Sequence, residues 1–597
     1  MVFTDEDSRT DLWFWFPFGA VGIRTLLLFI SALAIFILRV AQLHIGARTT
    51  PSPFQSLRAY LIRYNTFQTV GWYFFSAWWF SEVYMWSAAK DPRLMWVLEG
   101  KAHERPRLNE QPIYLRSFFF MLATMQSMVH LYEDYDRLPL PIDANAIPTP
   151  TIPVEQLRAV LPRRAQKALL RSLSMVVMGP IIYSLFLRAS VWGWSLYVTK
   201  MFWSLPRSSS TPPLRAPYHI SLLWRSAGAS FFLMLLWEMS NAIFNVFAAQ
   251  QPLKRGQPLT EDSRDPNGSL LIGLRAKKEV PKAFAFWELC YISQRPSVRR
   301  ASFFEDLDRT GGTTWSQVLD LCLDVVGEVN SRIGTALKPP APPEPEPVQA
   351  APSGNPQPLP RLTPPLKEGP IFSASPRPSS RPEMVQSTVG SMAKSLGQTP
   401  ASSPNGPRLS PRVKRAVGSA VNQALPAGMK HALSQDGWSS TVKFYVLQFL
   451  QSSLGAPFQQ TLQRRSAAIV LGTPYGDMGM VMHAVDALAK LGVSSLKEDP
   501  YGNVATDVPI MIRTFVSTIG NLNKLKVTLT PHWTDVNATG PNYRDHSFEE
   551  VDCLLGAVQE ALAQLVHAFA SYADTMGLSR GEMRLAREAA DMDSDRD

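Results

Sequence analysis

Long apolar runs fill much of the first 250 residues and give way to shorter helical periodicity further along the chain. A bilayer core about 30 Å thick requires roughly 20 apolar residues in a helix. Runs of that length predict five membrane spans, at residues 18–38, 66–88, 113–132, 173–203 and 220–247. The fourth is divided by Arg188, so it allows one tilted span followed by an interfacial helix, or two passes.

Beyond the last apolar run the pattern becomes that of a soluble protein. Residues 248–337 carry apolar positions at three-and-four spacing and predict a helical segment that packs on the membrane helices or on later helices. Residues 338–412, rich in Pro, Ser and Gly, predict a disordered linker, and helical periodicity returns at 413–597. With a short tail at 1–17, we expect an α-helical multi-pass membrane protein. Its mostly α-helical soluble C-terminal region is interrupted by the disordered Pro/Ser-rich linker.

The clearest amphipathic helix lies near the C-terminus. Ser547 and Glu550 stand at capping-box spacing, and the pattern ends near Gly577. Its apolar face consists of Val551, Leu554, Leu555, Val558, Leu562, Leu565 and Phe569. Such a face requires helical partners, either within the chain or on another protein. We interpret it as a candidate partner-docking face.

Charge and cysteine content restrict the topology more than the chemistry. The chain has 59 Lys and Arg against 49 Asp and Glu, and seven basic residues follow the last span between Lys254 and Lys282. This favours a cytoplasmic or nucleoplasmic C-terminal half, so five spans place the N-terminus in the lumen. No cleavable signal peptide is predicted, and the sequons at Asn267 and Asn537 should be unmodified. Three scattered cysteines encode neither a disulfide framework nor a zinc site.

One group of titratable residues at a span boundary could belong to a membrane enzyme. His130 lies beside Glu133, Asp134 and Asp136, which could form a metal or acid–base cluster. A single His lacks the repeated His spacing of di-iron and zinc membrane enzymes, and acidic residues outside a span are ordinary. The glycine-rich segment 472–479 lacks the G-K-[ST] ending of a phosphate-binding loop and is interpreted as a loop before a helix. We therefore assign no catalytic, cofactor-binding or metal-binding residue.

Two carboxylates inside predicted spans raise the alternative of a transporter or channel. Glu82 and Glu238 would be costly if uncompensated in hydrocarbon. We expect each to pair with a neighbouring span's Arg24, Arg116 or Arg225 or to face the protein interior. No internal repeat supports a transporter.

Four segments together resemble the Ndc-type transmembrane nucleoporins of fungi. They are RPRLNEQPIYLRSFFF at 105–120, HLYEDYDRL, FWELCYISQ, and SLKEDPYGNVATDVP at 495–509. The last includes a candidate family-motif segment formed by Ser495, Leu496, Glu498, Asp499, Tyr501 and Gly502, which either binds a partner or forms a turn. Members of that family typically have six spans with both termini on one side, so this chain departs from the pattern at its first span.

The resemblance implies a structural, non-enzymatic protein of the nuclear pore membrane. It implies anchoring of nuclear pore complexes and, in fungi, a role in spindle pole body insertion. The implied partners are the nuclear envelope bilayer, soluble linker and scaffold nucleoporins, other pore membrane proteins and spindle pole body components. Neither nucleic acid nor a small-molecule substrate is expected. The alternatives are a membrane enzyme of lipid metabolism and a transporter or channel.

Overall fold

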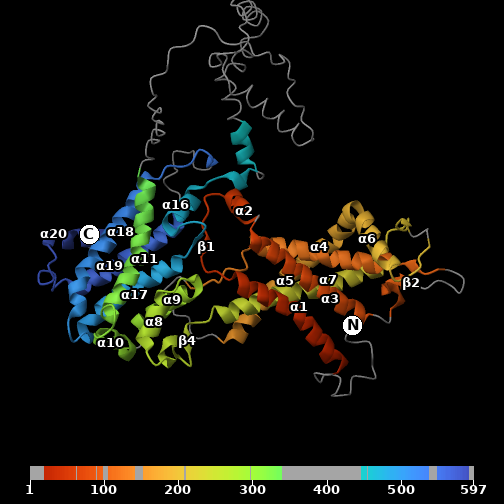
Figure 1. The fold of residues 1–597 in the computed structure, drawn as a ribbon. Coiled ribbons are helices and arrows are strands. Elements are labelled where there is room, and N and C mark those ends of the chain that lie inside the picture. Colours follow the sequence, from red (N-terminus) through yellow and green to blue (C-terminus); the bar gives the residue numbers. More distant parts are fainter. Residues whose placement is uncertain are drawn as a thin grey trace, which may run out of the picture. The chain divides into compact units, whose positions relative to one another are not determined.

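The computed structural model describes residues 19–61, 63–88, 91–98, 105–141, 152–206, 210–295, 297–338, 445–452, 455–536 and 548–590 (Figure 1). The chain divides into a larger unit, formed by residues 1–338 and 453–597, and a smaller unit at 339–452. In the smaller unit only residues 445–452 are described, and 445–451 of them are helical. The linker predicted at 338–412 lies, apart from Lys338, outside the described residues.

Each of the five predicted spans lies on a helix of the larger unit. The helices are α1 (Ala20–Gln42), α3 (Tyr64–Ser87), α4 (Glu110–Tyr132), α5 (Pro153–Ile182), η4 (Tyr183–Leu187), α6 (Arg188–Lys200) and α7 (Ile220–Ala248). Among described residues, three stretches are long and apolar enough to cross a membrane: Val21–Gln42, Pro153–Lys200 and Ile220–Ala248. Helices α3 and α4, with 24 and 23 residues, fall outside that group. Helix α3 is rich in Trp and Tyr, whose rings favour the membrane interface over its centre.

The fourth predicted span is part of one continuous 48-residue helix formed by α5, η4 and α6. At 1.5 Å per residue it is roughly 72 Å long, more than twice the hydrocarbon thickness. The helix runs through Arg188 after a π-helical turn at Tyr183–Leu187, so the two apolar stretches on either side of Arg188 belong to one helix. Arg188 pairs with Glu110 through Nε and Nη2 at 2.6 and 3.0 Å.

Large aromatic and aliphatic side chains pack these helices together. Helix α5 packs along α7, α1 along α3, and α3 along α4. Tyr73, Phe118, Phe119 and Trp237 are fully buried at their centre. At Gly179 a Cβ would come within 2.9 Å of the Phe118 ring, so only glycine allows α5 this close to α4.

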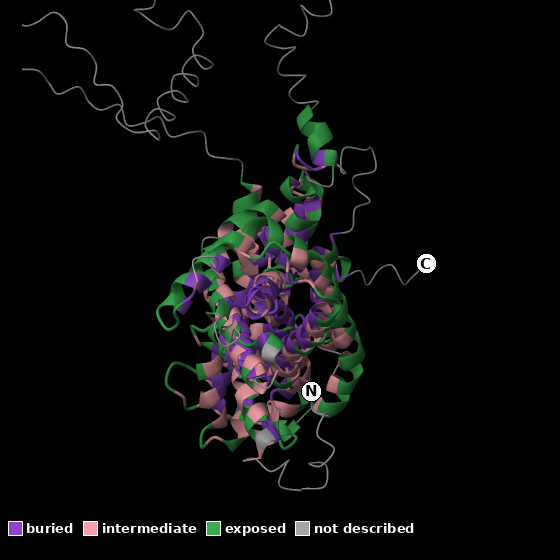
Figure 2. Cartoon of the chain, turned by 90° about the vertical axis from the view of Figure 1, so that its right-hand side faces the viewer, coloured by how far each residue is buried: buried purple, intermediate pink, exposed green. Residues whose placement is uncertain are grey.

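Other large apolar side chains of the same helices are exposed. In Figure 2, exposed residues, drawn in green, lie mainly along the outside of the ribbon. The exposed apolar side chains include Phe29, Val40, Phe67, Val177, Leu185, Phe186, Trp194 and Phe232. So many exposed large apolar side chains on these helices suit contact with lipid.

The remaining helices of the larger unit form a second core. They are α8 (Pro266–Leu274), α9 (Glu279–Gln294), α10 (Ser297–Glu305), α11 (Thr314–Leu337), α16 (Leu462–Leu471), α17 (Met478–Glu498), α18 (Asn503–Thr528), α19 (Glu549–Phe569) and α20 (Arg580–Ala589). Helix α17 packs on α9 and α19, and α11 packs on α18. The segment predicted at 248–337 and the domain predicted at 413–597 thus share one hydrophobic core, which we call the soluble helical domain.

Short elements complete the unit. Among the described residues they are α2 (Pro53–Leu61), η3 (Pro92–Leu94), η6 (Leu259–Asp262), η7 (Ala456–Phe458) and three antiparallel two-stranded sheets. The sheets pair β1 (Ala47–Arg48) with β6 (Tyr475–Gly476), β2 (Val97–Leu98) with β3 (Arg107–Leu108), and β4 (Leu253–Lys254) with β5 (Gln257–Pro258). The β1–β6 pair links residues more than 400 positions apart and leads to the functional site.

Candidate functional site

An extended segment at residues 43–50, which we call the junction segment, follows the end of α1. The His44 N–H donates to Asp136 O at 3.3 Å, and the Leu138 N–H donates to His44 O at 2.8 Å. Further along, β1 pairs with β6, and the Thr49 N–H donates to Pro474 O at 3.1 Å. One short segment therefore holds the chain that follows α4 and the loop that precedes α17.

Side chains reinforce this connection. The Gly46 N–H donates to Glu279 Oε1 at 2.6 Å, which joins the junction segment to the start of α9. The Arg48 guanidinium donates to Leu131 O at 2.6 Å and to Asp134 Oδ1 at 2.8 Å, and lies 4.6 Å from the centre of the Tyr60 ring. Because guanidinium groups form strong charge-assisted hydrogen bonds, Arg48 fixes three elements at once.

The electrostatics at the junction segment favour a charged Asp134. Burial alone would raise its pKa, but the hydrogen bond from His44 and the charge of Arg48 outweigh burial and lower the pKa. The pKa of His44 is raised, because its interaction with Asp134 outweighs the opposing effect of burial. The His44 ring also lies 4.5 Å from the ring of Tyr475 on β6. These charges hold the junction segment in place.

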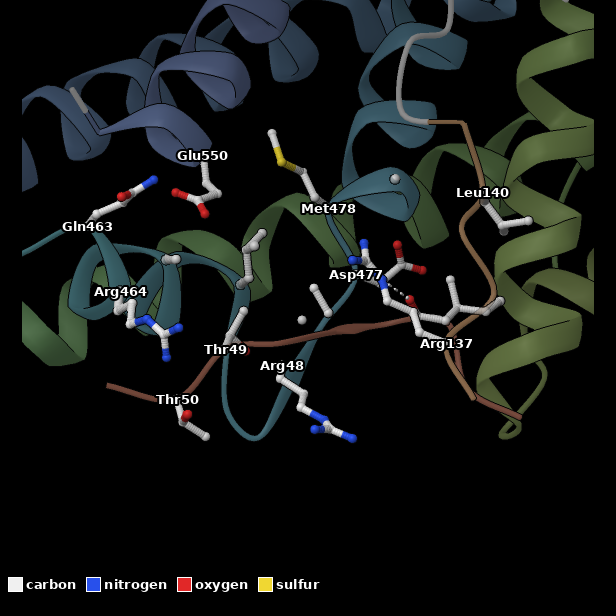
Figure 3. A pocket seen from close by; sticks show the side chains of 16 residues that line it. Arg48, Thr49, Thr50, Arg137, Leu140, Gln463, Arg464, Asp477, Met478 and Glu550 are labelled. Atoms are coloured by element: carbon white, nitrogen blue, oxygen red, sulfur yellow. Dashed lines mark hydrogen bonds between the residues drawn. The ribbon is translucent and has the colours of Figure 1, made fainter. Parts of the chain in front are cut away.

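A pocket of about 460 Å³ opens beside the junction segment (Figure 3). Arg48, Thr49 and Arg137 line it together with Arg464 of α16 and Asp477. The Asp477 carboxylate accepts from the Met480 N–H at 3.1 Å and caps α17. Burial raises the pKa of Asp477. The interpretation of residues 472–479 as a loop before a helix is confirmed, since α17 begins at Met478.

Glu238 is fully buried among the membrane helices and is surrounded by donors. Its carboxylate accepts hydrogen bonds from Gln126 and Tyr135 at 2.9 Å, from Arg164 at 2.9 Å and from Arg171 at 2.5 Å. Two guanidinium groups therefore neutralise the charge that raised the transport alternative. Neither is among the three arginines expected as partners. Both lie in the charged first half of the 48-residue helix, outside the apolar run.

The other predicted intramembrane carboxylate pairs as expected. Glu82 Oε2 lies 2.8 Å from Arg116 Nη2, and this pair is partly exposed. Arg225 instead pairs with Asp91, and the Arg24 guanidinium lies 5.9 Å from the centre of the Trp86 ring. Both carboxylates thus have cationic partners, so neither is an uncompensated charge among the membrane helices.

The titratable group around His130 separates into distinct interactions. His130 Nδ1 lies 3.0 Å from the Tyr73 hydroxyl, and Nε2 lies 2.9 Å from Asp136 Oδ2. Arg39 Nε lies 3.6 Å from Asp136 Oδ1, and Arg39 also donates to Asn241 at 3.1 Å. This polar chain links α1, α3, α4 and α7.

The neighbouring acids have other partners. Glu133 pairs with Lys167 and Arg171, and Asp134 pairs with Arg48. Within the described ranges, no group of three or more His, Cys, Asp or Glu residues is placed to hold a metal ion. The geometry of these residues is that of structural ion pairs.

The docking interpretation of α19 requires correction. Val551, Leu554, Val558, Leu562, Leu565 and Phe569 are at most 1 % exposed in the core of the soluble helical domain, and Leu555 is partly buried there. Helices α16, α17 and α18 cover the face, so the partner is the chain itself. At Gly492 of α17 a Cβ would lie 2.9 Å from the Leu565 side chain, which shows how closely α17 approaches. The predicted cap Ser547 lies outside the described residues, and α19 ends at Phe569, before Gly577.

The family-motif segment forms the turn between α17 and α18. The Asp499 carboxylate accepts from the N–H groups of Tyr501, Gly502 and Val504 at 2.9–3.0 Å. Gly502 adopts a φ of +71°, which a residue with a Cβ rarely tolerates. Glu498 forms a two-pronged ion pair with Arg300 of α10.

The side chains of this turn differ in exposure. Ser495 is buried, whereas Leu496 and Tyr501 are 46 % and 61 % exposed. The motif segment therefore forms a turn that leaves two apolar side chains at the surface.

Of the two sequons, Asn267 is buried and donates to Ser302 O at 3.2 Å, and Asn537 lies outside the described residues.

Comparison with known proteins agrees with this architecture. The sequence model of the family described as Nucleoporin protein Ndc1-Nup matches residues 1–587. Nucleoporin NDC1 of Chaetomium thermophilum is 36 % identical, over 98 % of this chain and 91 % of its own length. Nuclear envelope protein ndc1 of Schizosaccharomyces pombe is 23 % identical, over 82 % of this chain and 75 % of its own. The chain therefore belongs to the Ndc1-Nup family of nucleoporins, as the resemblance predicted.

Proposed function

We propose that this protein is an integral membrane nucleoporin that anchors the nuclear pore complex in the nuclear envelope and supports its assembly. The observation that carries the proposal is the junction segment, which ties the membrane helices to the soluble helical domain through β1–β6 and the Gly46–Glu279 hydrogen bond. An anchor requires such continuity, because a load on the soluble part must reach the membrane. The names of both relatives support the same role.

We further propose five passes, made by α1, α3, α4, the helix at 153–200 and α7. The junction segment lies on one side of these helices. On that side α1, α4 and α7 end, and α3 and the 153–200 helix begin. The basic residues after α7 favour the cytoplasm or nucleoplasm for that side. A glycosylation sequon engineered before α1 should then be modified in the lumen, whereas one at the β4–β5 hairpin should not. Glycan on the hairpin would reverse the proposed orientation.

For partner binding we propose the exposed part of the family-motif segment. Leu496 and Tyr501 offer apolar surface beside the charged Glu498–Arg300 pair, and aromatic residues are common anchors in protein interfaces. The double variant Leu496→Glu with Tyr501→Glu should lose soluble nucleoporins from co-purification. Ile510→Glu on α18, with 48 % exposure in the wild type, is the matched control and should keep them. Equal recovery from both variants would exclude this surface.

Conditional depletion of the protein tests the anchoring function directly. We expect the density of pores in the nuclear envelope to fall as the protein is lost, and re-expression of the full chain to restore it. Electron microscopy of envelope cross-sections provides the count. An unchanged pore density after complete depletion would contradict the proposal.

A further inference from the structure

Helix α2, between α1 and α3, has two unlike faces. Its inner face contacts the rest of the unit: Ser56 hydrogen-bonds Thr50, and the Tyr60 ring lies 5.7 Å from that of Tyr475. No residue of α2 is buried, so these contacts hold one side of the helix and leave the opposite side open.

The open face carries large apolar side chains. Phe54, Leu57 and Leu61 recur at the spacing of one helical face and are 40 %, 56 % and 57 % exposed. The Phe54 ring lies 4.5 Å from that of Phe458 in η7, which is itself 38 % exposed and enlarges the apolar surface. Arg58 stands on the same face. An exposed apolar stripe is typical of helices that lie in a membrane interface, and the long side chain of Arg58 can extend from this stripe to the lipid headgroups.

The height of α2 along the membrane helices follows from a hydrogen bond. The Gln42 side chain at the end of α1 donates to Asn65 O at the start of α3 at 2.8 Å, so these two helix ends are level with each other. Helix α2 ends at Leu61, and α3 begins at Tyr64. Helix α2 therefore leaves the bundle where both helices reach the membrane boundary.

We propose that α2 lies in the plane of the membrane surface and inserts Phe54, Leu57 and Leu61 into the interfacial layer of a leaflet containing anionic lipid. Arg58 and Arg63 reach the lipid phosphates, since their stems extend past the apolar layer while the guanidinium groups stay hydrated. The exposed outer surface of α1 continues directly into this layer through Val40, which is 69 % exposed. The inference rests on the proposed membrane crossing of α1 and α3.

Site-directed spin labelling of the full chain in vesicles of phosphatidylcholine and phosphatidylserine tests this contact. With Cys553→Ser as background, nitroxides are placed through Leu57→Cys on the open face and Gln55→Cys beside it. Phe29→Cys on the outer side of α1 reports the span itself. All three positions are at least half exposed or polar in the structure, so labelling leaves the fold intact.

The expected result is that the label at Leu57 is more accessible to oxygen than to a water-soluble nickel chelate, as at Phe29, whereas the label at Gln55 shows the reverse. Nickel accessibility at Leu57 with oxygen accessibility at Phe29 would overturn the inference and leave the spans intact. Nickel accessibility at both would instead contradict the proposed membrane crossing. A label at Leu57 that is immobile and shielded from both reagents would show protein contact there, which also overturns the inference.

Discussion

The burial of Leu562 in α19 gives a sharp test of whether this helix is core or docking surface. Its side chain has no exposed area and lies in the core shared by residues 270–333 and 462–590. Leu562→Ala removes three buried carbon atoms, worth about 2.4 kcal/mol at about 0.8 kcal/mol each. The cavity left behind raises the total loss of unfolding free energy to about 3–5 kcal/mol.

Native cysteines provide the assay. Cys322 belongs to the same core and is fully buried, so a thiol reagent reaches it only when the domain opens. In detergent-solubilised full-length protein carrying Cys553→Ser, Leu562→Ala should label Cys322 roughly 100- to 4,000-fold faster, provided that reclosing outpaces labelling. Leu585→Ala on α20, 52 % exposed in the wild type, is the control and should stay within about 0.5 kcal/mol of the parent protein.

Burial of the α19 face would be refuted if Leu562→Ala left Cys322 labelling at the parent rate and instead released a bound protein partner. That combination would mean that the α19 face is open in solution. Loss of partner binding together with fast labelling would be an indirect effect of unfolding and is consistent with the account.

Three further predictions concern charge. Burial lowers the pKa of His483, which is 2 % exposed, to about 4, so as pH falls the unfolded chain binds a proton at His483 before the folded chain does. The unfolding free energy should therefore fall by about 3 kcal/mol as pH drops from about 6.5 to 4. His483→Gln should lessen that fall, as measured by pH-dependent labelling of Cys322. Arg48→Ala removes two hydrogen bonds of the junction segment. Hydrogen exchange at the Thr49 amide should become faster by an amount corresponding to about 1–3 kcal/mol. Arg158 is exposed, and Arg158→Ala, the control, should leave the exchange rate of Thr49 unchanged. Glu238→Gln leaves Arg164 without a charged partner and Arg171 with Glu133 alone, and should cost about 3–5 kcal/mol in thermal unfolding in detergent. Glu82→Gln breaks a partly exposed pair and should cost at most about 1 kcal/mol; equal effects would contradict the burial assigned to Glu238.

Periodicity in the sequence located α19 and the apolar membrane helices, because those signals are local. It could not identify which helices cover α19, because the packing of α17 and α18 on that face depends on the tertiary structure and not on residues next to α19 in the sequence. The predicted partner surface is therefore a face of α19 that other helices of the same chain cover. A true capping box was missed one helix later, where Ser579 and Glu582 bond reciprocally at the start of α20.

The partners of Glu238 illustrate a second limit. Arg164 and Arg171 lie in a charged stretch that hydropathy places outside the membrane, yet this stretch is helical and packs along α7. The junction segment was equally inaccessible to sequence analysis. Its pairing with β6 spans two residues on each side, too few for any alternating pattern, and joins positions 47–48 to 475–476. Only the tertiary structure brings them together.

The central claim, that this chain is a membrane anchor of the nuclear pore, is tested most directly by live-cell imaging of the full-length protein tagged at its C-terminus beside a scaffold nucleoporin marker. The account predicts a punctate signal at the nuclear rim that coincides with the pores. A smooth reticular signal without enrichment at pores would contradict it.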